Sequence, residues 1–91
     1  MTLDSFQQKI ILISGATSGI GKAVSLLFAS HGYRVYAGYR NVEKGNALLE
    51  EAKKTSLPLS IVSLDITNSD SVKEAVETVF LDLKNKLSFD N

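Results

Sequence analysis

Three glycines and three hydroxyl residues lie close together near the start of the chain, in the segment SGATSGIG. Gly15, Gly19 and Gly21 leave the backbone free of side chains, while Thr17 and Ser18 add hydroxyl groups. Where a bend without side chains leads into a helix, several unpaired backbone N–H groups and the partial positive charge of the helix N-terminus point toward the same site. An isolated glycine pair would indicate only a turn. Here the bend follows an aliphatic run and precedes a helical pattern, and this order predicts a phosphate-binding turn.

The spacing of the glycines separates two kinds of phosphate-binding turn. A P-loop has four residues between its first glycine and a Gly-Lys-Ser/Thr triplet. In this chain five residues separate Gly15 from Gly21, and Ala23 stands where the magnesium-binding hydroxyl would be. The spacing therefore argues against a P-loop, and Lys22 is expected to be a solvated helix residue. We expect Gly15 to permit a tight exit from the strand, Gly19 to let the backbone approach a pyrophosphate and Gly21 to allow close helix packing.

The segments around the bend alternate between strand and helix patterns. Unalternating aliphatic residues are typical of a parallel strand that is buried on both faces, and apolar residues at i, i+3, i+4 and i+7 are typical of a helix. The predicted order is a strand over 9–14, a helix over 20–31, a strand over 33–39, a helix after Asn41, a strand over 59–64 and a helix after Thr67.

Local signals predict how these helices begin and end. Asn41 is expected to cap the second helix, in which Gly45 is a weak point. Thr67 with Asp70 three residues later has the form of a capping box, with aspartate in place of the usual Glu or Gln. His31 is expected to lie on the surface, at the negative end of the first helix.

The order βαβαβα predicts half of a Rossmann-type, doubly wound α/β fold. Right-handed crossovers between neighbouring strands give a parallel sheet of strand order 3-2-1. With 91 residues the chain forms one partial domain, 1–91, with a modest core. The first strand then lies at an edge, where an apolar strand is an aggregation hazard. We therefore expect the chain to be truncated before a fourth strand that would pair there.

The composition excludes several classes of function. Ten Lys and Arg balance ten Asp and Glu, so the charge does not suggest nucleic acid or an anionic membrane as a partner. The absence of cysteine excludes a disulfide framework, a thiolate nucleophile and a Cys-ligated zinc, and His31 alone cannot supply a metal site. The polar N-terminus and the short apolar run behind it predict neither a signal peptide nor a membrane span. We expect a soluble, cytoplasmic protein.

Several segments in register resemble the short-chain dehydrogenase/reductase family. SGATSGIG is similar to the family's TGxxxGIG signature, with Ser14 in place of threonine, and LDIT at 64–67 is similar to its Asp-Val-Thr segment. YRN at 39–41 falls at the end of the second strand, and the likeness covers essentially the whole chain. The resemblance implies an oxidoreductase that transfers a hydride between NAD(P)(H) and a carbonyl or alcohol.

The end of the second strand indicates which dinucleotide is bound. A carboxylate at this position bonds the ribose 2′-hydroxyl of NAD and repels a 2′-phosphate. Here the position is Tyr39, followed by Arg40, whose guanidinium can grip a phosphate. NADP is therefore favoured over NAD, although Arg40 is alternatively an exposed residue that leads into a helix. Asn41 is either a cap alone or also a ligand contact.

The resemblance also implies an adenine site. Asp65 would accept a hydrogen bond from the exocyclic amine, and Ile66 would donate a backbone N–H, while the alternative for Asp65 is a turn or cap residue. The predicted cofactor-binding residues are Gly15, Thr17, Ser18, Gly19, Ile20, Gly21, Tyr39, Arg40, Asn41, Asp65 and Ile66.

The family's catalytic residues are missing from this sequence. None of its three tyrosines, Tyr33, Tyr36 and Tyr39, has a lysine four residues later, and the family's Asn-Asn-Ala-Gly segment is absent. We therefore expect the cofactor half of a reductase, which is not catalytic alone and which self-associates or pairs with a missing C-terminal half. The alternative is a non-catalytic nucleotide-binding or interaction module that pairs through its exposed first strand.

Overall fold

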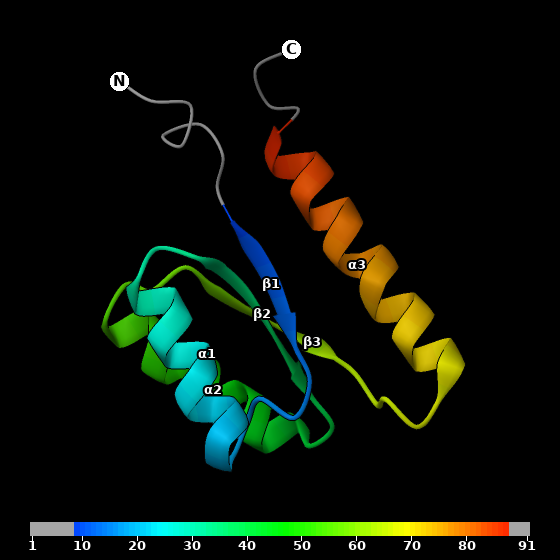
Figure 1. Ribbon diagram of the computed structural model, residues 1–91, viewed down its shortest axis with the longest axis horizontal. Helices are drawn as coiled ribbons and strands as arrows, with labels where there is room; N and C mark the ends of the chain where they lie inside the picture. Colours follow the sequence, from blue (N-terminus) through cyan, green and yellow to red (C-terminus); the bar gives the residue numbers. More distant parts are fainter. Residues whose placement is uncertain (1–8, 88–91) are drawn as a thin grey trace.

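The structure of the protein is a computed structural model that describes residues 9–87, apart from the side chains of residues 86 and 87. The expectation for the polar N-terminal segment lies outside the described residues. The predicted order of strands and helices is confirmed (Figure 1). The elements are β1 (Ile10–Ile13), α1 (Gly19–Ser30), β2 (Arg34–Tyr39), α2 (Val42–Lys54), β3 (Leu59–Ser63) and α3 (Ser69–Leu87).

The three strands form one parallel sheet in the order β1-β2-β3, which confirms the predicted 3-2-1 arrangement. Ile11 pairs with Val35, and Val35 pairs in turn with Leu59. Among the described residues β1 is paired on one side only, and Ile10 is 46% exposed. The apolar first strand therefore lies at an open edge, as predicted.

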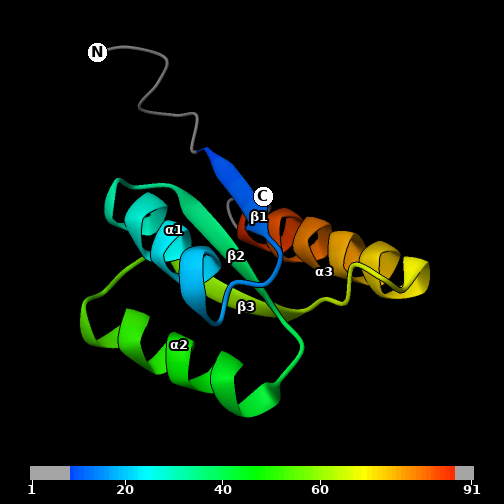
Figure 2. The same ribbon diagram turned by 60° about the horizontal axis from the view of Figure 1, so that its bottom comes forward.

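The helices cover both faces of the sheet in three layers. Helices α1 and α2 lie on one face and α3 on the other (Figure 2). The core is accordingly divided into two clusters, one on each face of the sheet. The first has Ala16, Ala29, Val35, Ala37, Leu48, Ala52 and Leu59 as its buried members, and the second has Tyr36, Val62, Leu64 and Ala75.

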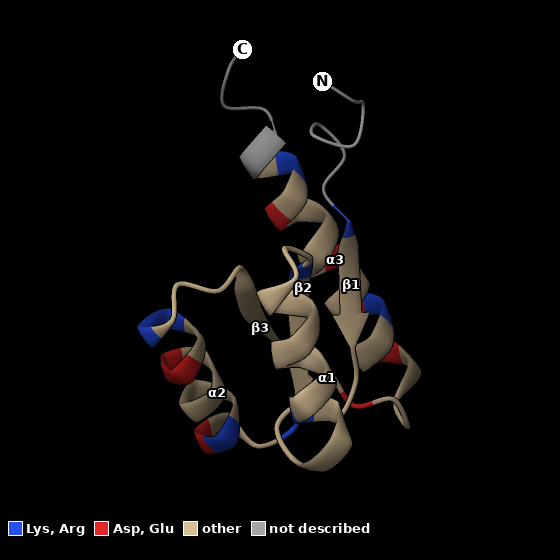
Figure 3. Ribbon diagram, turned by 60° about the vertical axis from the view of Figure 1, so that its left-hand side comes forward, with Lys and Arg blue, Asp and Glu red and all other residues tan. Residues whose placement is uncertain are grey.

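Helix α2 begins as its sequence predicts. The Asn41 side chain accepts a hydrogen bond from the Lys44 amide at 3.0 Å, which confirms the cap. Glu43 in the first turn and the lysines in the last turn interact favourably with the helix dipole and so stabilise α2. These charges lie at the two ends of α2, whereas α1 carries almost none (Figure 3).

The capping box at Thr67 is a wrong prediction. Helix α3 begins at Ser69, and the side chain of Asn68 accepts hydrogen bonds from the amides of Asp70 (2.9 Å) and Ser71 (3.1 Å). Thr67 is engaged elsewhere, because both its amide and its hydroxyl donate to Oδ1 of Asp65. The cap therefore passes to the next residue, which is an equally good N-cap type.

A polar contact fastens α3 to the sheet. The hydroxyl of Tyr36 on β2 donates to Oδ2 of Asp82 at 2.5 Å, and Nη2 of Arg34 lies 3.8 Å from the same oxygen. Burial and the hydrogen bond to Asp82 raise the pKa of the Tyr36 phenol above 10.0. The phenol thus stays neutral and keeps its donor for Asp82.

No helix in the described part of the chain is long and apolar enough to cross a membrane.

Candidate functional site

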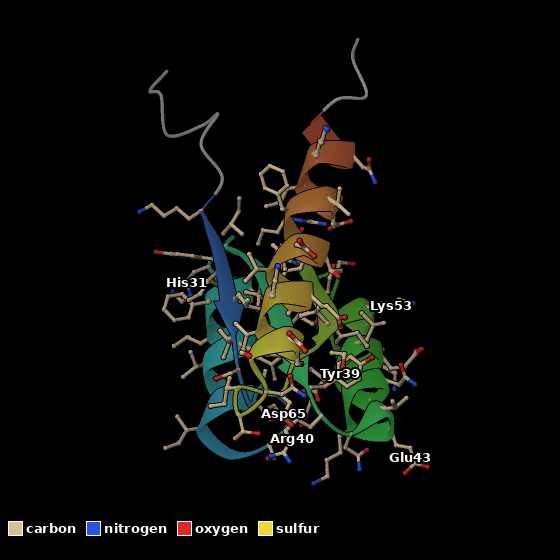
Figure 4. The ribbon with its side chains drawn as sticks, turned by 90° about the vertical axis from the view of Figure 1, so that its right-hand side faces the viewer. His31, Tyr39, Arg40, Glu43, Lys53 and Asp65 are labelled. Carbon is tan, nitrogen blue, oxygen red and sulfur yellow. The ribbon has the colours of Figure 1, made fainter. Side chains whose placement is uncertain are left out.

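The predicted site residues gather at one edge of the sheet. Because the strands are parallel, their carboxyl ends meet there, and ligands of open α/β sheets bind at this edge. The glycine bend follows β1, Arg40 follows β2 and Asp65 follows β3. Arg40 and Asp65 accordingly lie near one another below the strand ends (Figure 4).

The glycine bend has the backbone that its sequence demands. Gly15 and Gly19 have φ of +57° and +58°, in the left-handed region where side chains are disfavoured. A Cβ on either would meet nothing within 4 Å, so both backbones are open to a ligand. A Cβ on Gly21 would lie 2.0 Å from the carbonyl oxygen of Gly15. The third glycine therefore lets α1 pack against the bend itself, which is more local than the expected packing on the sheet.

Helix α1 begins without a side-chain cap. Ser18 is its N-cap residue, with extended φ and ψ of −154° and 160°, but its hydroxyl makes no capping hydrogen bond. The amides of the first turn, at Gly19, Ile20 and Gly21, therefore receive no cap from Ser18, in contrast to α2 with its Asn41 cap. Uncapped first-turn amides are the donors that bind anions at helix N-termini.

Two neighbouring openings in the surface contain most of the predicted residues. We call the larger, of about 470 Å³, the loop cleft; it is lined by Gly15, Thr17, Ser18, Arg40, Asn41 and Lys44. The smaller, of about 270 Å³, is the strand-end pocket; it is lined by Tyr39, Arg40, Ser63, Leu64 and Asp65. Arg40 lines both, so the two openings adjoin at its side chain.

Four of the predicted residues line neither opening: Gly19, Ile20, Gly21 and Ile66. Ile20 is 83% exposed and Ile66 is 66% exposed, and neither side chain lines the loop cleft or the strand-end pocket. The prediction for Ile66 concerned its backbone N–H, so exposure of the side chain does not test it.

Asp65 has a structural role at the end of β3. Its Oδ1 accepts from the Thr67 hydroxyl at 2.6 Å and from the Thr67 amide at 3.0 Å. These bonds, and to a smaller extent the charge of Arg40, lower the pKa of the Asp65 carboxyl below its ordinary value. Its own amide donates to the Ser71 hydroxyl at 2.9 Å. The turn role is thus confirmed, and an ionised carboxylate lines the strand-end pocket.

Tyr39 also has a structural role. A Cβ on Gly45 would lie 2.8 Å from the Tyr39 ring. The absence of a side chain at Gly45 therefore leaves room for this ring to pack on α2. Gly45 is therefore a packing residue as well as a weak helix former. This contact joins a strand end to a helix, and no local signal in the sequence indicates it.

The structure also tests the residues that were assigned to the surface. Nζ of Lys22 lies 3.2 Å from a carboxylate oxygen of Glu51, and both side chains are about half-exposed. This ion pair confirms that Lys22 is a residue of the helix surface. Nδ1 of His31 lies 3.0 Å from the carbonyl oxygen of Leu27 at the end of α1, as predicted. Within residues 9–87 no group of three or more His, Cys, Asp or Glu residues is arranged to hold a metal ion.

One residue of the loop cleft was missed at the sequence level. Lys44 lines the cleft beside Arg40, although no motif in the sequence includes it. The signal that points to it is its place in the first turn of α2, immediately after the strand end that carries Arg40.

Sequence comparison finds a family and several relatives. The profile described as short chain dehydrogenase matches residues 9–87. A 3-oxoacyl-(acyl-carrier-protein) reductase of Thermotoga maritima is 44% identical over 71 residues, which are 78% of this chain and 29% of that protein. A 3beta-hydroxysteroid dehydrogenase of Mediterraneibacter gnavus is 40% identical over 68 residues, 75% of this chain and 25% of that protein. The chain thus spans less than a third of the length of these relatives.

Solved structures share the fold. A metagenomic short-chain oxidoreductase in complex with NADP superposes with a TM-score of 0.74 and 27% identity, over 81% of this chain and 34% of that one. An actinorhodin polyketide ketoreductase with NADPH gives a TM-score of 0.75 and 26% identity, over 86% of this chain and 29% of that one.

Proposed function

Because the chain belongs to the short-chain dehydrogenase family, we propose that it is a cofactor-binding segment that holds NADP(H) at the carboxyl edge of its sheet. The segment corresponds to the N-terminal portion of the family fold and forms one partial domain. In the complete fold the bound cofactor supplies or accepts the hydride. The residues of this chain bind the nucleotide and do not orient a substrate, since the sequence holds no Tyr-x-x-x-Lys.

The observation that carries this proposal is the uncapped start of α1 beside the loop cleft. The Ser18 hydroxyl caps nothing, and the open backbones of Gly15 and Gly19 let a pyrophosphate come close. Each amide contributes modestly, but several charge-assisted hydrogen bonds act together. Thr17 and Ser18 line the same cleft and can add hydroxyl donors.

The adjoining strand-end pocket suits the adenosine half of the ligand. It presents the ionised Asp65 carboxylate, the acceptor that an exocyclic amine needs. Asp65 uses Oδ1 for Thr67, and Oδ2 has no hydrogen-bond partner within the described residues. Oδ2 would accept a hydrogen bond from the adenine amine, and the Ile66 backbone N–H would donate one to the adenine ring.

Arg40 supports NADP over NAD. It lines both openings at their junction, where a ribose bound between pyrophosphate and adenine would lie. No carboxylate lines the loop cleft, so nothing there repels a 2′-phosphate. Asn41 keeps its amide nitrogen available, because the cap uses only its oxygen.

Substitution of Arg40 tests the cofactor assignment. Arg40→Ala should weaken NADP binding about tenfold or more, as expected for loss of a charged hydrogen bond, and should leave NAD binding unchanged. Isothermal titration of the folded chain measures both affinities. Lys53→Ala, at the far end of α2, is the charge-matched control (Figure 4). An equal loss for both dinucleotides would refute the role of Arg40.

A second candidate function is supported by the open edge of β1. Beyond its exposed backbone edge, α1 on one face and α3 on the other also leave apolar side chains uncovered. On α1 these are Ile20 and Leu27, and on α3 they include Val76 (52% exposed) and Phe80 (65% exposed).

The helical positions place the α3 residues on the β1 side. Ser71, Glu74 and Thr78 line a pocket with β3 residues, so this flank of α3 faces the outer edge of β3. Val72, Val79 and Leu83 pack in the cluster that includes Leu12 of β1. With 3.6 residues per turn, Val76 and Phe80 lie on the opposite side of this apolar stripe from Ser71, Glu74 and Thr78. They therefore face the β1 side of the sheet.

In this second function the chain is an interaction module whose β1 edge pairs with another polypeptide, either a second copy or a C-terminal half. Sedimentation equilibrium over a range of concentrations tests self-association. A strictly monomeric chain whose melting temperature does not rise with NADP would contradict the module in its nucleotide-binding form.

A further inference from the structure

The loop cleft contains a second cation besides Arg40. Lys44 lines the cleft with Arg40 and Asn41, together with the glycine bend. The two cations belong to different elements: Arg40 follows β2, and Lys44 is the third residue of α2. The fold therefore brings two positive charges to one opening, and the lining of that opening holds no negative side chain.

Helix geometry directs Lys44 toward the cleft. Side chains of a helix lean toward its N-terminus, so a long side chain in the first turn reaches back over the cap residue. Asn41 fixes this turn, because its side chain accepts the Lys44 amide at 3.0 Å. The root of the Lys44 side chain is thus held beside Arg40, with which it lines the cleft, and Lys44 as a whole is exposed.

The position costs the folded chain some stability unless an anion is present. A lysine in the first turn opposes the helix dipole, and Arg40, a like charge, lines the same cleft. Lys44 makes no ion pair within the described residues, whereas Lys22 is paired with Glu51. A dianionic group in the cleft would relieve both unfavourable terms at once.

We infer that Lys44 is a second specificity-determining residue, which contacts the 2′-phosphate together with Arg40. The inference rests on the proposed function and adds a residue that the sequence motifs did not indicate. Arg40 approaches the phosphate from the strand end and Lys44 from the start of α2. The glycine bend remains for the pyrophosphate.

Small nucleotides test this inference without the nicotinamide half. Adenosine 2′,5′-bisphosphate, adenosine 3′,5′-bisphosphate and adenosine 5′-monophosphate are titrated into the chain and into Lys44→Gln. We expect about a fivefold loss for the 2′,5′ isomer, the magnitude of an exposed charge pair, and little change for the other two. Lys44→Arg should restore binding of the 2′,5′ isomer, and raising the salt concentration should shrink the difference between wild type and Lys44→Gln.

The controls separate this inference from the proposed function. Lys53→Gln removes the same charge from the last turn of α2 and should leave all three affinities unchanged. Equal weakening of all three nucleotides by Lys44→Gln, or no weakening in a chain whose 2′,5′ binding depends on Arg40, would overturn the role of Lys44 alone. Failure of the folded wild-type chain to bind any adenine nucleotide would overturn the proposed function, and this inference with it.

Discussion

At the scale of the residue, two glycines of the bend are required for different physical reasons. Gly19 has a left-handed backbone but open space around its missing side chain. Gly21 has no such φ, but its missing Cβ would overlap the carbonyl oxygen of Gly15. The first constraint is conformational and the second is steric, so the two glycines should respond differently to alanine.

Alanine substitutions can separate these constraints. Gly19→Ala should cost about 1 to 2 kcal/mol of unfolding free energy, the penalty of a left-handed alanine. Gly21→Ala should cost more than Gly19→Ala, about 3 kcal/mol, because a backbone carbonyl must move. Urea denaturation of both variants measures the difference. A Gly21→Ala protein as stable as Gly19→Ala would show that the bend is not packed as described.

At the scale of the element, α3 depends on the group formed by Tyr36, Asp82 and Arg34. The hydroxyl of Tyr36 joins β2 to α3 across the second core cluster. Its raised pKa means that the folded chain holds the phenolic proton more tightly than the unfolded chain does. The resulting stability is fully present below pH 10.0, the ordinary phenol value, and is lost as the pH rises through the higher folded value.

Tyr36→Phe should therefore lower the unfolding free energy by about 1 kcal/mol at pH 7, through loss of the bond to Asp82. The difference from wild type should shrink above pH 10.0, where the wild-type phenol begins to ionise. Urea denaturation at pH 7 and above pH 10 measures both effects. Tyr33→Phe, on the opposite face of the sheet, is the matched control. A difference that does not change with pH would contradict the role of the phenolic proton.

The elements themselves could be predicted because their signals are local and repeat along the chain. The aliphatic run before the bend is continuous over four residues, and the apolar stripe of α3 repeats the helical period several times. The cap of α3 was missed because Thr67 and Asn68 are adjacent and both suit an N-cap. Only the hydrogen bonds of Asp65 to Thr67 decide between them, and they form only in the folded turn.

The site was predictable where the residues of one short motif determine the local backbone geometry, as in the glycine bend. It was not predictable where two elements meet. The packing of Tyr39 on Gly45 and the convergence of Lys44 with Arg40 join residues whose relation is set by the angle between β2 and α2. Exposure and periodicity along one element carry no information about that angle.

At the scale of the whole molecule, the proposed association of the chain would take place at the open edge of β1. Ile10 is exposed at this edge, and a lysine there would add a charge that edge strands use to discourage pairing. Ile10→Lys should therefore shift a self-associating chain toward monomer, by about tenfold in the dissociation constant. Sedimentation equilibrium measures this shift. Leu81→Lys adds the same charge to an exposed apolar position on α3, off the β1-side flank, and should leave association unchanged.

Each strand of this sheet pairs with its immediate predecessor, β2 with β1 and β3 with β2. A ribosome that adds about 5 to 20 residues per second would release one strand and its helix every few seconds. Each new strand would find its pairing edge already synthesised, so the sheet can grow in step with translation. Within the described residues no strand covers the outer edge of β1, so this apolar edge would be exposed on the nascent chain from the first pairing onward.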